Sequence, residues 1–296
     1  MTLKEHNRPT GKKRKHADLA RPALGSFGRS EWAILGAPCD AIKALAGKLI
    51  AALSPAKVAY VDASHADEVD TIIPVDNADI GYTAHNDRQE LSYRGGLNAF
   101  QNRQLLNGSD MILVNGNHHQ AQKQVVIIDS RKKASLQKRL TQLTDTRLFL
   151  LADGENELFD FIKDAIPNWQ QIPVYSLNET ERIIQFFKDA LQQSKPMLNG
   201  LVLAGGKSER MGQDKGGINW HRKEQRYHMA DLLKDYANEV YISCRADQQQ
   251  EIDPAYATLT DTFTGLGPFG AILSAFREQP ERAWLVVACD LPLLDK

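Results

Sequence analysis

The sequence predicts an α/β protein with two domains, each built around a largely parallel sheet. Short apolar runs alternate with longer amphipathic segments from Trp32 onward, as repeated βαβ units require. The chain has 296 residues, which is enough for two separate hydrophobic cores. A polar stretch at residues 192–196 ends in proline just before a new apolar run, so we expect the boundary between the domains there.

The elements expected in the first domain follow this alternation in order. A strand at residues 32–35 precedes a helix at 40–53, whose apolar residues fall on one side. The further strands expected are residues 57–61, 71–75, 111–114, 125–128, 148–151 and 173–176. The further helices expected are residues 98–106, 158–165 and 179–191. Residues 76–110 are otherwise polar, and no strand is predicted within them.

The second domain shows the same alternation in a shorter span. The strands expected are residues 198–203, 240–243, 258–259 and 284–288, and a helix is expected at 229–236. Another helix should start near Pro268, because proline favours the first helical turn. Ala204, Asp261 and Asp290 each follow one of these strands. In open α/β sheets ligands bind beyond the carboxyl ends of the strands, so one crevice is expected to collect all three.

The composition excludes several classes of protein. The formal net charge is -1, which argues against a whole-protein surface for nucleic acid. No apolar run approaches a membrane span, and the N-terminus does not resemble a signal peptide, so no membrane partner is expected. Cys39, Cys244 and Cys289 lack C-x-x-C spacing and lie at apolar runs. We expect three buried free thiols and a cytoplasmic protein.

The N-terminal segment differs from the rest of the chain. Residues 1–30 are mostly polar, with basic residues at 12–15, and they show no hydrophobic periodicity. A disordered, solvated tail is therefore expected there. The domain organisation predicted from the sequence is this tail, a first domain at residues 31–194 and a second domain at residues 195–296.

The most informative stretch, residues 201–215, reads LVLAGGKSERMGQDK. Gly205 and Gly206 follow the predicted strand, and without a Cβ their backbone N–H groups can approach a ligand closely. Arg210 and Lys215 lie in the loop that follows. Backbone N–H groups with nearby cations suit a polyphosphate. The pattern G-x-x-x-x-G-K-[ST] cannot be laid over this stretch, so the sequence predicts a phosphate site that is not a Walker A loop.

Three ordered motifs carry a resemblance to a known family. The string at residues 203–215, Asp261 with GPFG at 267–270, and ACDLP at 288–292 resemble the signature of the molybdenum cofactor guanylyltransferases (MobA type). These enzymes belong to the nucleotidyltransferases with a Rossmann-like fold. The resemblance implies two three-layer αβα domains, of which the second has this Rossmann-like nucleotidyltransferase fold in incomplete form.

The resemblance also implies an activity and a set of site residues. The reaction is transfer of GMP from GTP to molybdopterin with release of pyrophosphate, and Mg²⁺ is the cofactor. Lys215, Arg210 and Asp290 match catalytic positions, and Asp290 is also the expected ligand of Mg²⁺. The positions implied to bind the nucleotide are Leu203, Ala204, Gly205, Gly206, Lys215 and Asp261.

Departures from the family pattern keep alternatives open. Phe269 stands where relatives have an aliphatic residue, and serine and cysteine precede Arg245 where relatives often have asparagine. A cytidylyltransferase, a sugar-phosphate nucleotidyltransferase of the same fold and a non-catalytic adaptor therefore remain possible readings. Family domains continue for roughly another ninety residues after the position of Lys296. On that comparison we expect an incomplete domain with poor or absent turnover.

The first domain has a fainter resemblance. Residues 110–116, followed by His118 and His119, resemble the MobB-type adaptor of the same cofactor pathway, a P-loop GTP-binding protein. In the corresponding loop, residues 36–43, only Gly36 matches the P-loop pattern. The resemblance implies a degenerate adaptor that binds Mg-GTP poorly and contacts other proteins of molybdenum cofactor synthesis; an unrelated α/β module is the alternative. The adjacent histidines are expected to form a surface pair, because no cysteine or carboxylate stands at metal spacing.

Overall fold

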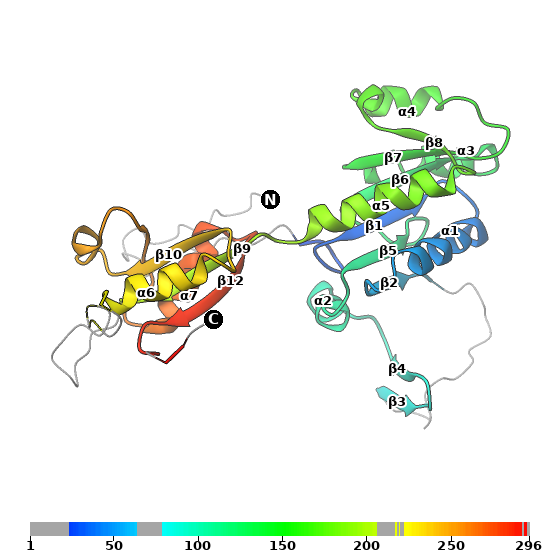
Figure 1. Cartoon of the computed structure of the whole chain (residues 1–296). Helices are drawn as coiled ribbons and strands as arrows, with labels where there is room; N and C mark the ends of the chain where they lie inside the picture. Colours follow the sequence, from blue (N-terminus) through cyan, green and yellow to red (C-terminus); the bar gives the residue numbers. More distant parts are fainter. Residues whose placement is uncertain are drawn as a thin grey trace, which may run out of the picture. The chain divides into compact units, whose positions relative to one another are not determined.

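The structure is a computed structural model that describes residues 24–63, 79–205, 217, 219, 222–291 and 293–294 (Figure 1). The chain divides into two compact units at Pro196. The first unit is Leu24–Lys195 and the second begins at Pro196. Both units are α/β structures with parallel sheets and flanking helices, as the sequence predicts.

The first unit is built on a six-stranded sheet in which every neighbouring pair is parallel. The strand order is β2-β5-β1-β6-β7-β8. The strands are β1 (Glu31–Leu35), β2 (Val58–Val61), β5 (Met111–Asn115), β6 (Lys123–Ile128), β7 (Thr146–Leu151) and β8 (Val174–Ser176). Every residue of β1 and β5 is buried, because other elements cover both faces of the sheet. Strands covered on both faces read as continuous apolar runs.

Helices lie on both faces of this sheet. α1 (Cys39–Ala52) and α5 (Thr180–Ser194) cover one face, where Leu49 and Phe187 are fully buried. α3 (Lys133–Gln137) and α4 (Asp160–Ala165) cover the other face with Leu136 and Ile162. α2 (Ala99–Leu106) begins at Asn98, whose side chain accepts hydrogen bonds from two backbone N–H groups of the first turn.

The prediction for residues 76–110 missed a β-hairpin. β3 (Ile80–Ala84) and β4 (Gln89–Tyr93) pair in antiparallel register where no strand was expected. Both strands are largely exposed and carry polar residues between apolar ones, so they give no apolar run. The strand expected at residues 71–75 lies outside the described residues.

Part of the segment expected to be an N-terminal tail packs on the first unit. Residues 1–23 lie outside the described part of the chain, but residues 24–30 pack on the first unit. Phe27 is 8% exposed and clusters with Ile112 and Val114. The prediction of a solvated tail is therefore wrong for residues 24–30, because the buried ring of Phe27 and hydrogen bonds to Glu31 hold a segment that has no periodicity.

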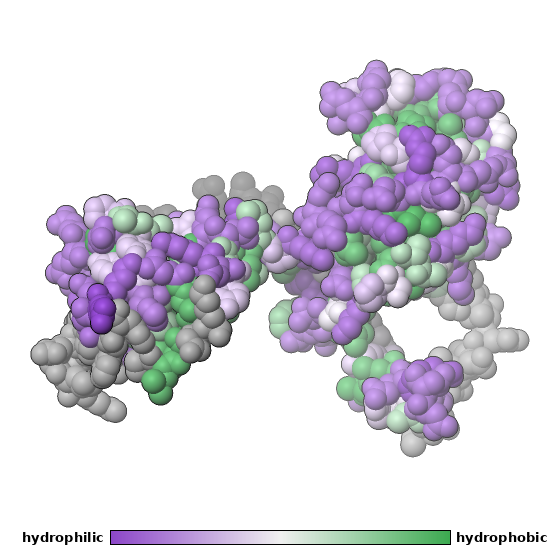
Figure 2. Space-filling model, in the orientation of Figure 1, coloured by the Kyte–Doolittle hydropathy of each residue, from purple (hydrophilic) through white to green (hydrophobic). Residues whose placement is uncertain are grey.

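The second unit has a four-stranded parallel sheet in the order β11-β10-β9-β12. Its strands are β9 (Leu198–Leu203), β10 (Glu239–Cys244), β11 (Ala257–Thr260) and β12 (Ala283–Ala288). α6 (Gln225–Leu233) packs on one face and α7 (Pro268–Glu278) on the other. β12 is half-buried along its whole length, and Figure 2 shows hydrophobic residues on this side of the unit.

Two helix predictions in the second unit have different outcomes. α7 starts at Pro268, in agreement with the sequence, and Gly267 takes a φ of 57° just before it. α6 starts at Gln225, four residues before the predicted start, because Gln225 and Arg226 are buried although they read as polar surface. In the described part of the chain, each helix is too short or too polar to cross a bilayer.

Candidate functional site

The candidate site of the second unit lies at the carboxyl edge of its sheet. From β9 the chain runs to β10 and β11 on one side and then to β12 on the other side. The strand order therefore reverses between β9 and β12, which is where open α/β sheets bind ligands. Ala204 and Gly205 follow β9 at this point, and Asp290 follows β12 and is exposed.

The backbone after β9 packs closely on its neighbours. The N–H of Ala204 donates to the carbonyl of Ser243 at 3.2 Å, and the N–H of Cys289 donates to the carbonyl of Leu203 at 3.4 Å. A Cβ on Gly205 would lie 3.4 Å from backbone atoms of residues 244 and 245, which is an ordinary van der Waals distance, so this packing alone does not require glycine. The other residues predicted to hold the nucleotide, Gly206, Arg210 and Lys215, lie outside the described residues.

Asp261 begins the loop after β11 and is held by that loop. Its Oδ1 accepts from the N–H of Phe263 at 2.8 Å and from the hydroxyl of Ser274 at 3.1 Å. Among the described residues nothing donates a hydrogen bond to its Oδ2. One oxygen thus fixes the loop on α7, and the other remains available to a ligand.

Asp261 and Asp290 follow the two outer strands of the sheet. Three strand spacings separate β11 from β12, which is about 14 Å. The two carboxylates therefore share an edge of the sheet but do not form one ion site. A ligand that contacts both must be extended, as a nucleoside triphosphate is.

Two arginines that the sequence prediction left out of the site lie near the end of β10. Arg245 donates from Nη1 to the carbonyl of Gly205 at 3.2 Å, and its other nitrogens bind Asp247. Arg226 is 8% exposed and pairs with Glu224. Burial raises the pKa of the nearby Cys244 thiol, while Arg226 and Arg245 act in the opposite direction. These cations favour an anionic ligand beside Gly205.

The turn that carries Asp290 is tied to the start of α6. Nε2 of Gln225 donates to the carbonyl of Leu291 at 3.4 Å. Oε1 of Gln225 is buried, and no partner for it occurs among the described residues. An unpaired buried acceptor beside the switch point marks a place where a donor on a ligand can bind.

The donor set fits a Mg²⁺ ion that phosphate groups help to hold. The described residues contain no group of three histidines, cysteines or carboxylates that could enclose a metal ion. Mg²⁺ is commonly bound through one or two carboxylates, with phosphate oxygens and water as the remaining ligands. Asp290 is an exposed carboxylate at the switch point, so it can provide such a contact once a polyphosphate is bound.

Comparison with known proteins agrees with this geometry. Residues 200–296 match the family described as "MobA-like NTP transferase domain". The second unit is therefore similar to this nucleotidyltransferase domain, and its parallel sheet with flanking helices agrees with that similarity.

The individual relatives that match this segment are all named for the molybdenum cofactor. The "Molybdenum cofactor biosynthesis bifunctional protein" of Synechocystis is 40% identical over 103 residues, covering 34% of this chain and 30% of that protein. The "Molybdenum cofactor guanylyltransferase" of Pseudomonas entomophila is 29% identical over 103 residues, 34% of this chain and 54% of the relative. A guanylyltransferase of the same name from Xanthomonas euvesicatoria is 38% identical over 97 residues, 32% and 48% of the two chains. The matched segment spans about a third to a half of the length of these relatives.

The corresponding edge of the first unit carries the loop predicted to be a degenerate P-loop. Gly36 has a φ of 93°, and a Cβ there would lie 2.2 Å from the carbonyl oxygen of Ile127. The packing of β1 against β6 therefore requires this glycine, whether or not the loop binds phosphate. Pro38 precedes α1, and among the described residues no side chain caps this helix.

Two predictions at this edge were wrong. Cys39 is half-buried, unlike the fully buried Cys244 and Cys289, although all three are free thiols. His118 does not belong to a surface pair, because its side chain is only 16% exposed and faces Cys39. The apolar strand before Cys39 suggested burial, but the residue stands at the open end of that strand.

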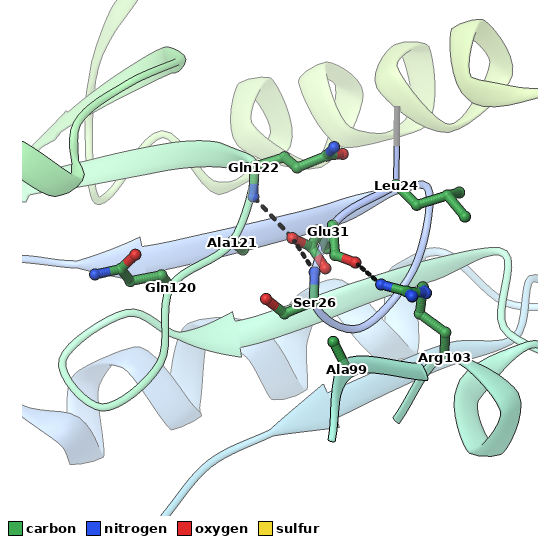
Figure 3. Close-up of a pocket in the computed structure, with 9 residues that line it drawn as sticks. Leu24, Ser26, Glu31, Ala99, Arg103, Gln120, Ala121 and Gln122 are labelled. Atoms are coloured by element: carbon green, nitrogen blue, oxygen red, sulfur yellow. Dashed lines mark hydrogen bonds between the residues drawn. The ribbon is translucent and has the colours of Figure 1, made fainter. Parts of the chain in front are cut away.

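A pocket of about 340 Å³ lies near Glu31, at the start of β1 (Figure 3). Glu31 is 1% exposed, and its carboxylate accepts four backbone hydrogen bonds. Three come from the N–H groups of Ser26, Phe27 and Gly28, and one comes from that of Gln122. These bonds occupy the carboxylate within the protein, so we assign Glu31 a structural role.

Proposed function

We propose that the second unit binds GTP with Mg²⁺ and transfers GMP to molybdopterin, with release of pyrophosphate. The observation that carries the proposal is the switch point, where the backbone of Ala204 and Gly205 lies one strand from Asp290. The family match over residues 200–296 and the names of the relatives support the same reaction. The matched segment covers only about a third to a half of each relative. That this chain carries out the complete reaction is therefore part of the proposal.

Each group at the site has a chemical task in this proposal. The backbone of residues 203–206 lies against the nucleotide, and the N–H groups of Gly205 and Gly206, with Arg210 and Lys215, neutralise the triphosphate. Asp261 accepts from the nucleoside, and Asp290 holds Mg²⁺. A phosphate oxygen of molybdopterin attacks the α-phosphorus of GTP, the bond from that phosphorus to the bridging oxygen breaks, and pyrophosphate leaves. The protein contributes orientation and charge stabilisation and forms no covalent intermediate.

The first unit is proposed to be a degenerate adaptor domain. Its parallel sheet places Gly36 at the end of β1, where a P-loop would stand, but Ile42 and Lys43 replace the residues that bind phosphate and Mg²⁺. Such a unit would contact other proteins of cofactor synthesis without hydrolysing GTP. A cytoplasmic location belongs to the same proposal, since free thiols such as Cys39, Cys244 and Cys289 are usual in a reducing compartment.

Calorimetric titration with GTP, CTP and ATP, with and without Mg²⁺, tests the proposed site. GTP is expected to bind more tightly than CTP and ATP, and Mg²⁺ is expected to strengthen its binding. The Asp290→Asn variant should lose about tenfold in affinity for Mg-GTP, because it lacks the charge that holds the ion, and little in affinity for GTP without metal. Release of pyrophosphate on addition of molybdopterin would then establish turnover.

Asp253→Asn is the matched control. Asp253 precedes β11, at the opposite edge of the sheet, and accepts from the N–H of Ala255 at 2.9 Å. It should bind Mg-GTP as the unchanged protein does. Equal affinity of the Asp290 variant and the control would show that Asp290 does not hold the metal. Preference for CTP would instead support the cytidylyltransferase alternative.

A further inference from the structure

The carboxyl edge of the first sheet brings together a thiol, an imidazole and a carboxylate. Sγ of Cys39 lies 3.3 Å from Nε2 of His118, and the same nitrogen lies 3.9 Å from Oδ1 of Asp62. The three residues follow β1, β5 and β2, which are adjacent in the sheet. They lie at the carboxyl edge of the sheet, on the β1 side of the point between β1 and β6 where the strand order reverses, and α/β sheets bind ligands at such an edge.

We propose that Cys39 is a reactive thiol that forms a mixed disulfide with low-molecular-weight disulfides, with His118 as the base that takes its proton. The proposal concerns the first unit and does not depend on nucleotidyl transfer in the second. It gives the degenerate loop at residues 36–39 a chemical function that phosphate binding no longer explains.

The carboxylate of Asp62 stabilises the protonated form of His118. Burial disfavours the Asp62 carboxylate, but hydrogen bonds from Tyr60, the N–H of Ala63 and Asn115, with the charge that His118 carries when it is protonated, keep the pKa of Asp62 below its usual range. The hydroxyl of Tyr60 donates to Oδ2 at 2.7 Å, and Nδ2 of Asn115 donates to Oδ1 at 2.9 Å. A fixed carboxylate beside Nε2 stabilises the imidazolium that forms when His118 takes a proton.

The other groups around the thiol favour its anionic form or leave it accessible. Cys39 is the first residue of α1, a 14-residue helix, and a thiolate is stabilised at a helix N-terminus. Nδ2 of Asn117 lies 3.6 Å from Sγ. The side chain of Cys39 is half-buried, so a small disulfide can reach it.

Four other titratable groups lie near the cluster, and they are Tyr60, His119, Arg139 and Asp40. Desolvation and the neighbouring Asp62 raise the pKa of Tyr60, on β2, so its phenol stays protonated. His119 contacts the carbonyl of Asp62 at 3.3 Å, and Arg139 donates to the carbonyl of Asn117 at 2.9 Å. Asp40 follows Cys39 on α1. Among the described residues, the side chains of His118 and Asn117 lie within hydrogen-bond distance of Sγ, and of these two only His118 can take its proton.

The chemical step balances without a further reactant. The proton of Cys39 passes to Nε2 of His118, and the thiolate attacks one sulfur of the disulfide R–S–S–R. A bond forms between Sγ and that sulfur, and the original S–S bond breaks. The leaving thiolate takes the proton from the imidazolium and departs as R–SH. Cys39 is oxidised to the mixed disulfide, and one half of the small disulfide is reduced to the thiol.

The rate of reaction with dithiodipyridine, a small disulfide whose released thione is coloured, measures this reactivity in the folded protein. One thione per chain is expected, and peptide mass mapping should place the adduct on Cys39. The variant His118→Ala should react about tenfold more slowly at pH 7. The ratio of the two rates should fall towards one at pH 10, because an ordinary cysteine ionises near pH 8.5 without a base.

The neighbouring histidine provides a matched control. His119 packs edge-on against Phe27, and its ring contacts the carbonyl of Asp62 rather than Cys39, so His119→Ala should react at the rate of the unchanged protein. Circular dichroism verifies that both variants are folded. An adduct on Cys244 or Cys289 in the native protein would overturn the proposal. Equal rates for the His118 and His119 variants at pH 7 would also overturn it, and so would a rate ratio that does not change with pH.

Discussion

Replacing Glu31 with alanine is expected to lower the free energy of unfolding of the first unit by about 3 kcal/mol. The substitution leaves four backbone N–H groups without their acceptor, at 2.7 to 3.2 Å from a carboxylate that is 1% exposed. It also frees residues 26–28 from the start of β1. Urea unfolding, with hydrogen exchange to locate the change in the first unit, measures the effect.

A second variant separates the loss of acceptors from the loss of packing. Oε1 and Oε2 of Glu31 each accept two N–H groups, so Glu31→Gln places an amide N–H₂ against two donors in either orientation. This variant should also lose more than about 1 kcal/mol. Glu157→Ala is the control, because Glu157 is 81% exposed in its ion pair with Lys163. A Glu31→Gln protein as stable as the original would show that packing alone anchors the segment.

The second large effect is expected at Gly270, in the first turn of α7. A Cβ there would lie 2.3 Å from the carbonyl oxygen of Phe263 and 3.0 Å from Oδ2 of Asp261. Backbone cannot yield as a flexible side chain does, so Gly270→Ala should cost about 3 kcal/mol in the second unit. It should also weaken binding of GTP, because the loop that moves carries Asp261.

The control for this substitution is another glycine in a helix. Gly47 lies within α1, and a Cβ there meets nothing within 4 Å. Gly47→Ala should therefore stabilise the first unit by about 1 kcal/mol, since alanine has the higher helix propensity. Thermal unfolding and GTP titration of both variants test the pair. Unchanged affinity in a destabilised but folded Gly270→Ala protein would mean that Asp261 does not contact the nucleotide.

The sequence predicts the sheets of both units well because their strands are covered on two faces. Runs such as residues 111–114 and 201–203 are apolar throughout, and a buried parallel strand is the structure that such a run favours. The hairpin of β3 and β4 gave no such run, because its residues are largely exposed. Its pairing is local, and nothing in its composition distinguishes it from a polar loop.

The positions of some residues in the candidate sites could also be predicted from the sequence, whereas other contacts could not. Ala204, Asp261 and Asp290 could be predicted to share an edge, because each follows an apolar run and parallel strands end together. Their roles stay predictions. The contact of Arg245 with Gly205 depends on the register of β10 beside β9, and the contact of Cys39 with His118 joins residues 79 apart. No periodicity or spacing encodes either contact, so only the folded chain reveals them.

Gly200 sets the thickness of the layer between the second sheet and α6. A Cβ on this β9 residue would lie 3.1 Å from the side chain of Leu233, at the end of α6. A helix is stiff, and Gln225, roughly 12 Å along α6, reaches the turn after Asp290. A methyl group added at Gly200 would thus displace α6, whose first residue contacts the turn after Asp290, the residue proposed to hold Mg²⁺. Gly200→Ala should weaken Mg-GTP binding, and calorimetry showing unchanged affinity would disprove this remote coupling.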